Sequence, residues 1–243
     1  MSWVCVVPVK GSAAAKSRLG DLPEPLPARG ELAEAFALDT VAAVLASAMV
    51  EQVLVVTADP VAAAPLAALG AQIVPELAAT PAPAPAGTAP SVPTDAAAPS
   101  PTEPRDPLNA AISEGIRVAH ERYPLSHVAV LTGDLPALTT ADVDATLAAA
   151  AAQDRAMVAD EEGTGTTTLL ARAGLPLTPR FGPGSRAAHE AAGHRPLDLP
   201  ATASIRRDVD TVDNLAEVLR RGVGPHTSAL IARSQPMPGP PGR

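Results

Sequence analysis

The fold is decided by the stretch His127-Val128-Ala129-Val130-Leu131-Thr132-Gly133-Asp134-Leu135-Pro136-Ala137-Leu138. Its first part, 127–131, is a largely apolar run that predicts a buried strand. Asp134 follows at the carboxyl end of that strand, and Pro136 prevents the strand from continuing. Open α/β sheets bind ligands at that end, where a carboxylate can hold a metal ion and the ion can hold phosphates. Asp134 is therefore the first candidate metal ligand, with a structural cap as the alternative.

The segments before this stretch alternate between strands and helices. Apolar runs predict strands over 3–9, 53–57 and 71–75. We expect one helix over 31–49 and a shorter one from Asp59-Pro60 to Gly70. The inward face of the first helix is expected to consist of Leu38, Val41, Leu45 and Ala48. This β-α-β-α-β order predicts a parallel sheet with right-handed crossovers.

The alternation resumes after the central stretch. Helices are expected over 108–122, from Thr139 or Thr140 onward, over 187–192 and over 212–221, and strands over 156–159 and 197–199. The fold class is therefore α/β, a three-layer, Rossmann-like, mostly parallel sheet with helices on both faces.

Residues 77–105 are rich in Ala, Pro and Thr and lack periodicity. A packed loop of that length is improbable, so we expect a disordered and dispensable insertion. Because the α/β pattern resumes after it, we predict one domain over 1–233 that this insertion interrupts. The Pro/Gly-rich end, 234–243, is expected to be a disordered tail.

The composition narrows the function classes. The formal net charge of −8 disfavours a nucleic-acid-binding protein but leaves a small anionic substrate open. No signal peptide or membrane span is visible, which favours a cytoplasmic protein. Cys5 is the single cysteine and the histidines lack metal-ligand spacing, so neither a disulfide nor a zinc site is expected. His120 and His127 are expected at the surface.

A second acidic cluster contains Asp208 and Asp210. We expect a bend in this extended segment to let both carboxylates meet one metal ion. The alternative is structural, with solvated acids, or Asp210 or Thr211 capping the next helix. Together with Asp134, three carboxylates at strand ends suit Mg²⁺, which prefers a few carboxylates plus substrate phosphates.

Two loops of small residues are candidate anion sites. The Gly-Thr-Gly-Thr loop over 163–166 can let an anion approach its backbone, or it is an ordinary hairpin turn. Gly182 lies in a tight loop, and Ser185 begins a predicted helix, where it binds an anion or serves only as a cap.

Basic residues follow the first strand. Lys10, Lys16 and Arg18 would lie at the same sheet edge as Asp134 and could neutralise a triphosphate; a solvated loop is the alternative. Asn109 starts a helix, either as its N-cap or as a contact to a nucleobase or ribose.

A set of short motifs in this order resembles one family, the guanylyltransferases of deazaflavin coenzyme F-420 biosynthesis. The resemblance covers nearly the whole chain except 77–105 and the tail. The motifs are Val-Pro-Val-Lys and Ala-Lys-Ser-Arg-Leu within 7–19, Leu-Asn-Ala-Ala-Ile at 108–112, Gly-Asp-Leu-Pro-Ala-Leu at 133–138, Gly-Thr-Gly-Thr at 163–166, Phe-Gly-Pro-Gly-Ser at 181–185, His189, and Arg-Asp-Val-Asp-Thr at 207–211.

The resemblance implies a nucleotide-diphospho-sugar-transferase-like fold and transfer of GMP from GTP to a phosphorylated three-carbon acid, with release of diphosphate. It also implies Mg²⁺ and a downstream transferase that takes the product. By resemblance, Asp134, Asp208 and Asp210 hold Mg²⁺, and Thr166, Gly182 and Ser185 hold the acid. The basic opening loop, Lys10, Lys16 and Arg18, would hold the GTP phosphates. That loop departs from the Gly-Gly-x-Ser-x-Arg-Met loop of the wider nucleotidyltransferase class, and the resemblance assigns no residue to the base.

The acceptor follows from inferred lineage. Abundant Ala, Pro and Arg indicate a GC-rich actinobacterial genome, and the actinobacterial branch uses phosphoenolpyruvate, which would give enolpyruvyl-diphospho-5'-guanosine. Alternative acceptors are 2-phospho-L-lactate, 3-phosphoglycerate, a sugar phosphate or a molybdopterin. An alternative of another class is a non-catalytic nucleotide-binding module in which the acids are only caps.

Overall fold

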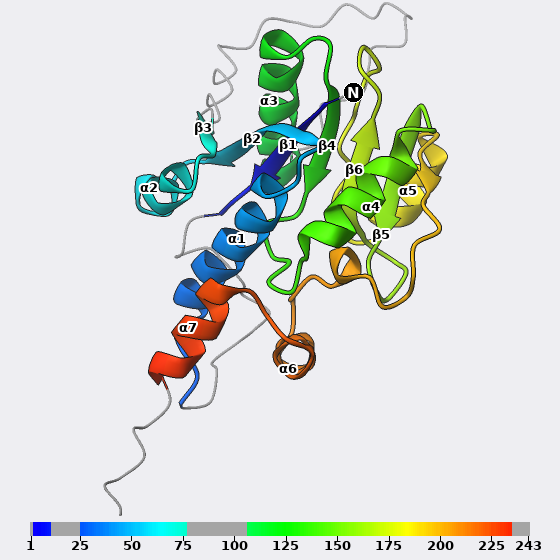
Figure 1. Ribbon diagram of the computed structural model, residues 1–243. Helices are drawn as coiled ribbons and strands as arrows, with labels where there is room; N and C mark the ends of the chain where they lie inside the picture. Colours follow the sequence, from blue (N-terminus) through cyan, green and yellow to red (C-terminus); the bar gives the residue numbers. More distant parts are fainter. Residues whose placement is uncertain (1, 11–24, 77–105, 235–243) are drawn as a thin grey trace, which may run out of the picture.

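The computed structural model describes residues 2–10, 25–76 and 106–234. Within these residues, seven strands form one sheet in the order β3-β2-β1-β4-β6-β5-β7 (Figure 1). The elements in chain order are β1 (Trp3–Pro8), α1 (Arg29–Leu45), β2 (Val50–Thr57), α2 (Pro60–Ala68), β3 (Gln72–Pro75), α3 (Pro107–Arg122), β4 (His127–Leu131), α4 (Thr140–Ala150), β5 (Arg155–Ala159), β6 (Thr166–Ala171), α5 (Ser185–Ala191), β7 (Arg195–Pro196), the 3-10 turn η2 (Ser204–Arg206), α6 (Val212–Arg221) and α7 (Pro225–Ser234).

One strand runs against the rest. The pairs of β1 with β2, β1 with β4, β2 with β3 and β5 with β7 are all parallel, whereas β6 is antiparallel to both β4 and β5. The first residues of β6 therefore lie at the sheet edge where β1 and β4 end. The predicted mostly parallel α/β sheet is confirmed.

The sheet is buried on both faces, as its continuous apolar strands require. Side chains alternate along β1: Cys5 and Val7 join the core formed with α1, α2 and α4, while Val4 and Val6 join the core formed with α3. Cys5 is fully buried, and burial raises the pKa of its thiol to about 12, in keeping with a structural role.

A smaller third cluster joins α1 to the C-terminal helices. Phe36 and Leu32 of α1 pack there with Val209, Leu215 of α6 and Leu230 of α7. This second contact explains why the predicted inward face of α1 was only partly right. Val41 is buried, but Leu38 and Leu45 are half-buried, and Ala48 is exposed beyond the helix end at Leu45.

Three other expectations need correction. The predicted strand over 197–199 is absent, because the pairing with β5 takes place at Arg195–Pro196 instead. His127 is buried in β4, where its ring packs edge-on against Trp3 and its Nδ1 accepts the N–H of Ala173. Helix α7 was not predicted, and it includes Ser234, the first residue of the expected tail.

Two expectations about disorder fall on residues outside the described ranges. These are the disordered insertion over 77–105 and the tail from 235 onward. Among the described residues, no helix is long and apolar enough to cross a membrane.

Candidate functional site

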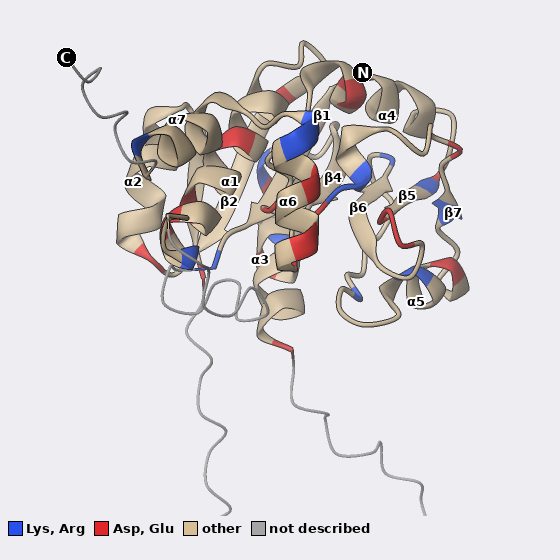
Figure 2. Cartoon of the chain, turned by 90° about the horizontal axis from the view of Figure 1, so that it is seen from below, with Lys and Arg blue, Asp and Glu red and all other residues tan. Residues whose placement is uncertain are grey.

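A cavity of about 630 Å³ opens at the carboxyl ends of β1 and β4 and the start of β6. Figure 2, viewed from below, shows α6 lying over the middle of the molecule, with both acidic and basic positions along it. The cavity is lined by Pro8, Val9, Lys10, Ala33, Ala37, Leu108, Ile112, Val130, Thr132, Gly133, Asp134, Asp160, Glu162, Thr164, Gly165, Thr166, Phe181, Gly182, Pro183, Gly184, Ser185, Asp208 and Asp210. The cavity therefore lies where open α/β sheets bind ligands.

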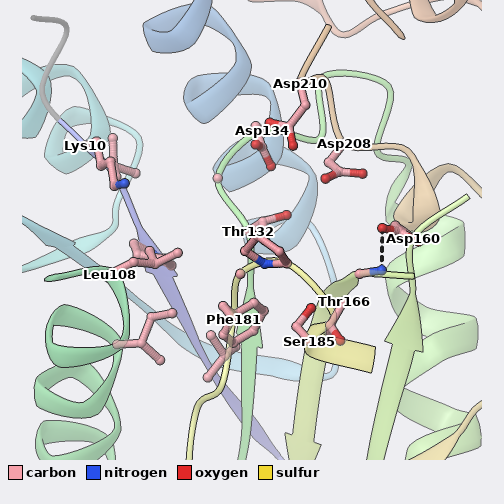
Figure 3. A pocket seen from close by; sticks show the side chains of 18 of the residues that line it. Lys10, Leu108, Thr132, Asp134, Asp160, Thr166, Phe181, Ser185, Asp208 and Asp210 are labelled. Carbon is pink, nitrogen blue, oxygen red and sulfur yellow. Dashed lines mark hydrogen bonds between the residues drawn. The ribbon is translucent and has the colours of Figure 1, made fainter. Parts of the chain in front are cut away.

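Three carboxylates converge at one side of this cavity. Asp134, Asp208 and Asp210 each offer an oxygen, and these oxygens lie within 4.8 Å of one another (Figure 3). All three residues are half-buried. The sequence grouped these acids, and the structure brings them together.

The backbone explains how the distant segments meet. The N–H of Val209 donates to the carbonyl oxygen of Asp134 at 3.1 Å, and the Val209 side chain is fully buried. Asp208 and Asp210 flank this inward residue, and positions two apart along a strand-like segment share a side. The bend that we expected is thus not required, because the alternation itself turns both carboxylates the same way.

Gly133 lets the Asp134 loop approach β1. A Cβ atom at this position would lie 2.9 Å from the carbonyl oxygen of Pro8, closer than side chains normally come. Glycine is therefore needed where the ends of β1 and β4 come together beneath the cavity.

The Gly163–Thr166 loop is a hairpin turn organised by Asp160. The buried carboxylate accepts the N–H groups of Thr164 at 2.9 Å and Gly165 at 2.7 Å. A Cβ on Gly165 would lie 2.2 Å from Oδ2 of Asp160, so the turn closes tightly on this side chain. The hairpin alternative is confirmed for this loop. Its expected anion-binding role was wrong for these two amides, since both already donate to Asp160.

Thr166 and Ser185 line the opposite side of the cavity from Lys10 (Figure 3). Both are buried. The Thr166 hydroxyl pairs with Nδ1 of the fully buried His189 at 3.0 Å.

Ser185 is the first residue of α5. It follows a loop in which Gly182 has a φ of 125° and Gly184 a φ of 73°, values that favour glycine. The structure thus brings the three residues proposed for one ligand, Thr166, Gly182 and Ser185, to one wall.

Asn109 holds the loop that forms this wall in place through hydrogen bonds to its backbone. Its Oδ1 accepts the N–H of Phe181 at 2.8 Å, and its Nδ2 donates to the carbonyl oxygen of Phe181 at 2.9 Å. The N-cap of α3 is Asp106, so the capping alternative for Asn109 was wrong. With its amide engaged in this way, Asn109 lies next to the cavity but does not line it.

The charge of the cavity is strongly negative. Five acidic residues line it, and Lys10 is the one basic side chain among the described lining residues. Lys16 and Arg18, also proposed for phosphates, lie outside the described residues. A polyphosphate entering this part of the cavity needs cations to offset the carboxylates, and three converging carboxylates are a donor set that suits a divalent ion.

Sequence reasoning missed two site residues. Asp160 was passed over as part of an acidic run, although an Asp just before a Gly-rich turn is the usual residue for closing such a turn. His189 entered only as part of a motif, because its two partners, Thr166 and Arg180, come from different segments.

Comparison with known proteins gives consistent relatives. No protein-family model matches the chain. It is 48% identical over 96% of its length to a phosphoenolpyruvate guanylyltransferase of Streptomyces scabiei, covering 97% of that protein. It is 43% identical over 96% of its length to a protein of the same name from Thermomonospora curvata, covering 90% of that protein.

Solved structures support the fold alone. A putative nucleotide-diphospho-sugar transferase from Desulfovibrio desulfuricans superposes with a TM-score of 0.56 at 16% identity, over 96% of this chain and 99% of that one. A 4-diphosphocytidyl-2C-methyl-D-erythritol synthase superposes with a TM-score of 0.54 at 14% identity, over 90% of this chain and 98% of that one. The nucleotide-diphospho-sugar-transferase-like fold expected from the sequence is confirmed.

Proposed function

The chain belongs to the phosphoenolpyruvate guanylyltransferase family, and from this premise we propose that its cavity transfers GMP from GTP to phosphoenolpyruvate. The products would be enolpyruvyl-diphospho-5'-guanosine and diphosphate. The observation that carries the proposal is the placement of Asp134, Asp208 and Asp210 between two unlike walls of one cavity.

The two walls suit the two substrates. Thr166, Gly182 and Ser185 offer hydroxyl and backbone groups, and we assign them to the phosphorylated acid. The opposite wall carries Lys10 beside the apolar Leu108, which suits a phosphate and a flat base respectively (Figure 3). Lys16 and Arg18 belong to the same proposed nucleotide side.

We propose that Asn109 serves the nucleotide indirectly. Because its amide is bonded to the backbone of Phe181, it ties the loop that leads to Ser185 to α3, the helix that carries Leu108 on the proposed nucleotide side.

The three acidic residues fit a divalent cation. Oxygen atoms from three carboxylates are the ligands that Mg²⁺ prefers, and Mg²⁺ is the proposed cofactor. When bound, it would offset the phosphate charge and lower the barrier to attack at phosphorus. Asp134, Asp208 and Asp210 would hold it.

The proposed chemistry needs no nucleophilic side chain. A phosphate oxygen of phosphoenolpyruvate forms a bond to the α-phosphorus of GTP, the bond from that phosphorus to the α,β-bridging oxygen breaks, and diphosphate leaves. Residues of the chain bind and orient: Thr166 and Ser185 hold the acceptor, while the apolar side chains of Leu108 and Phe181 exclude water from the cavity.

The decisive experiment is diphosphate release by purified protein with GTP and Mg²⁺, compared across phosphoenolpyruvate, 2-phospho-L-lactate and 3-phosphoglycerate. We expect the highest kcat/KM with phosphoenolpyruvate. A higher value with another acid would reassign the acceptor. GTP binding without turnover on any acceptor would favour the non-catalytic nucleotide-binding module.

The cellular setting is part of the same proposal. GTP and phosphoenolpyruvate are cytoplasmic metabolites, so we propose a cytoplasmic location. The activated diphosphate product calls for a transferase that uses it next, in the synthesis of coenzyme F-420.

A further inference from the structure

His189 occupies an unusual position behind the acceptor wall. Its ring is fully buried, packed edge-on against Phe181 and against His194. Both ring nitrogens are engaged. Nε2 accepts the backbone N–H of Arg180 at 2.9 Å, and Nδ1 lies 3.0 Å from the hydroxyl oxygen of Thr166.

These two contacts fix the tautomer of the ring. A backbone N–H can only donate, so Nε2 of His189 must carry no proton. Burial, and then the charges of His194 and Arg180, lower the pKa of His189 to about 4, so the ring is neutral near neutral pH. The one ring proton is therefore on Nδ1, where it is donated to the Thr166 oxygen.

This tautomer decides whether the Thr166 hydroxyl donates or accepts in its bond to the ring. A hydroxyl that accepts a hydrogen bond from the ring keeps its own proton for another partner. Thr166 lines the cavity, and within the described part of the chain His189 is the one hydrogen-bond partner of its hydroxyl. The hydroxyl proton is thus available to an acceptor atom in the cavity.

We propose that His189 is a positioning residue that presets the Thr166 hydroxyl as a hydrogen-bond donor to an anionic oxygen of the acceptor. This inference rests on the proposed function, because it names Thr166 as a contact to the phosphorylated acid. It goes beyond that function by assigning the direction of the hydrogen bond and the group that enforces it.

The arrangement is specific for the acceptor side. Two hydrogen bonds link the N–H of Arg180 through the His189 ring to the hydroxyl of Thr166. Thr166 lies on the same wall as Ser185, away from Lys10 (Figure 3). Loss of these two bonds should therefore affect binding of the acid and leave binding of GTP largely unchanged. A purely structural histidine would change both together, through the stability of the whole cavity.

The tautomer can be measured without any substrate. In a ¹⁵N spectrum of the histidine-labelled protein, compared with that of His189→Gln for assignment, we expect a protonated Nδ1 and an unprotonated Nε2 on His189. In free histidine near neutral pH, the opposite tautomer predominates. A protonated Nε2 on His189 would overturn the proposal whether or not the protein is a guanylyltransferase.

Kinetics test the direction of the effect. Thr166→Val should raise the KM for phosphoenolpyruvate by roughly tenfold to a hundredfold, as expected for a lost bond to a charged group, and change the KM for GTP little. His189→Leu should also raise the KM for phosphoenolpyruvate. His189→Gln, whose amide can both donate and accept, should raise this KM less than His189→Leu does. In the Thr166→Val background, His189→Leu should add little, because its effect passes through the hydroxyl.

Matched controls separate positioning from packing. His127→Gln removes another buried histidine whose ring accepts a backbone N–H, that of Ala173, and Thr168→Val removes a buried hydroxyl from the same strand as Thr166, outside the cavity. Neither should change the KM for the acid. Additive effects of Thr166→Val and His189→Leu, or equal rises in both KM values, would contradict the proposal. Absence of turnover in the unmodified protein would instead contradict the proposed function.

Discussion

The backbone N–H of Val209 donates to the carbonyl oxygen of Asp134 across 3.1 Å. This bond joins the loop after β4 to the segment before α6, and the buried Val209 side chain anchors it in the cluster around Phe36. The three carboxylates are thus positioned by the backbone and by packing. The Val209 bond uses no carboxylate atom, so replacing the side chain of Asp134 leaves this backbone contact in place.

The first prediction concerns Asp134. Asp134→Asn keeps the side-chain volume but removes a charged ligand, so we expect turnover to fall by roughly a hundredfold or more. Thermal unfolding should change little, because the Val209 bond uses the backbone of Asp134. Asp198→Asn, at an exposed position, is the matched control. Near-normal turnover of Asp134→Asn at saturating Mg²⁺ would remove Asp134 from the metal site.

The second prediction concerns cation dependence. Five acidic residues and one lysine line the described part of the cavity, so GTP should bind at least about tenfold more weakly in EDTA than in Mg²⁺. Isothermal titration calorimetry measures this difference. NaCl at equal ionic strength should not restore GTP binding. A monovalent cation has too low a charge density to bridge the carboxylates and the phosphates. Unchanged affinity in EDTA would mean that GTP binds without a divalent ion.

The third prediction concerns Ser185. Ser185→Ala should raise the KM for phosphoenolpyruvate by about tenfold and leave that for GTP nearly unchanged, because the residue lies on the acceptor wall. Steady-state kinetics with each substrate varied in turn provide the comparison. Ser113→Ala, on the exposed side of α3, is a control serine substitution. An equal loss for both substrates would remove Ser185 from the acceptor site.

The fourth prediction concerns Asp39, a buried acid outside the cavity. Its carboxylate accepts the N–H groups of His226 at 2.8 Å and Thr227 at 2.9 Å, and so caps α7 from α1. Asp39→Ala should lower the free energy of unfolding by about 2–3 kcal/mol, because it leaves buried amides unpaired. Urea denaturation measures this change. Glu34→Ala, on the same helix, should cost less than about 1 kcal/mol; an equal loss in both would argue against capping.

The fifth prediction concerns acid lability. The pKa of His189 is about 4 in the folded protein, against 6.5 ordinarily, so between these values the unfolded chain binds a proton that the folded chain does not. Stability is therefore lost as the pH falls through this window, by up to about 3 kcal/mol from His189. Burial lowers the pKa of His127 and His194 too, which acts in the same direction. Urea midpoints near pH 7 and near pH 5 should differ less in His189→Gln than in the unmodified protein; an equal difference would contradict the assignment.

Much of the fold could be predicted from the sequence, because its strands are uninterrupted apolar runs. Parallel strands buried on both faces need such runs, and the run over 127–131 placed Asp134 at the correct sheet edge. Helix α7 escaped prediction because it depends on Asp39, a partner 187 residues away in the chain. The inward face of α1 was misjudged because α1 packs against two clusters rather than one.

The candidate site was partly predictable for a related reason. Asp134, Asp208 and Asp210 were predicted to form one site from their residue type and their position relative to the strands. Their carboxylate oxygens do converge. The roles of Asn109, Asp160 and His189 depend on which atoms they contact. Asn109 was predicted to be a helix cap or a ligand contact. In the structure its side-chain amide is bonded to the backbone of Phe181. The pairings of Asn109 and His189 with distant segments leave no local pattern to read, whereas Asp160 closes a local turn four to five residues ahead of it.

The reversed direction of β6 has an evolutionary consequence. Because β6 begins at the edge where β1 and β4 end, Thr166, Gly182, Ser185 and His189 all fall within the one contiguous stretch 160–189. The acids proposed for the metal ion lie outside that stretch. In the proposed assignment, the acceptor wall and the metal ligands are therefore encoded in separate parts of the gene, so that exchange of one segment would retarget the chain to another phosphorylated acid and leave the proposed metal and nucleotide sites intact.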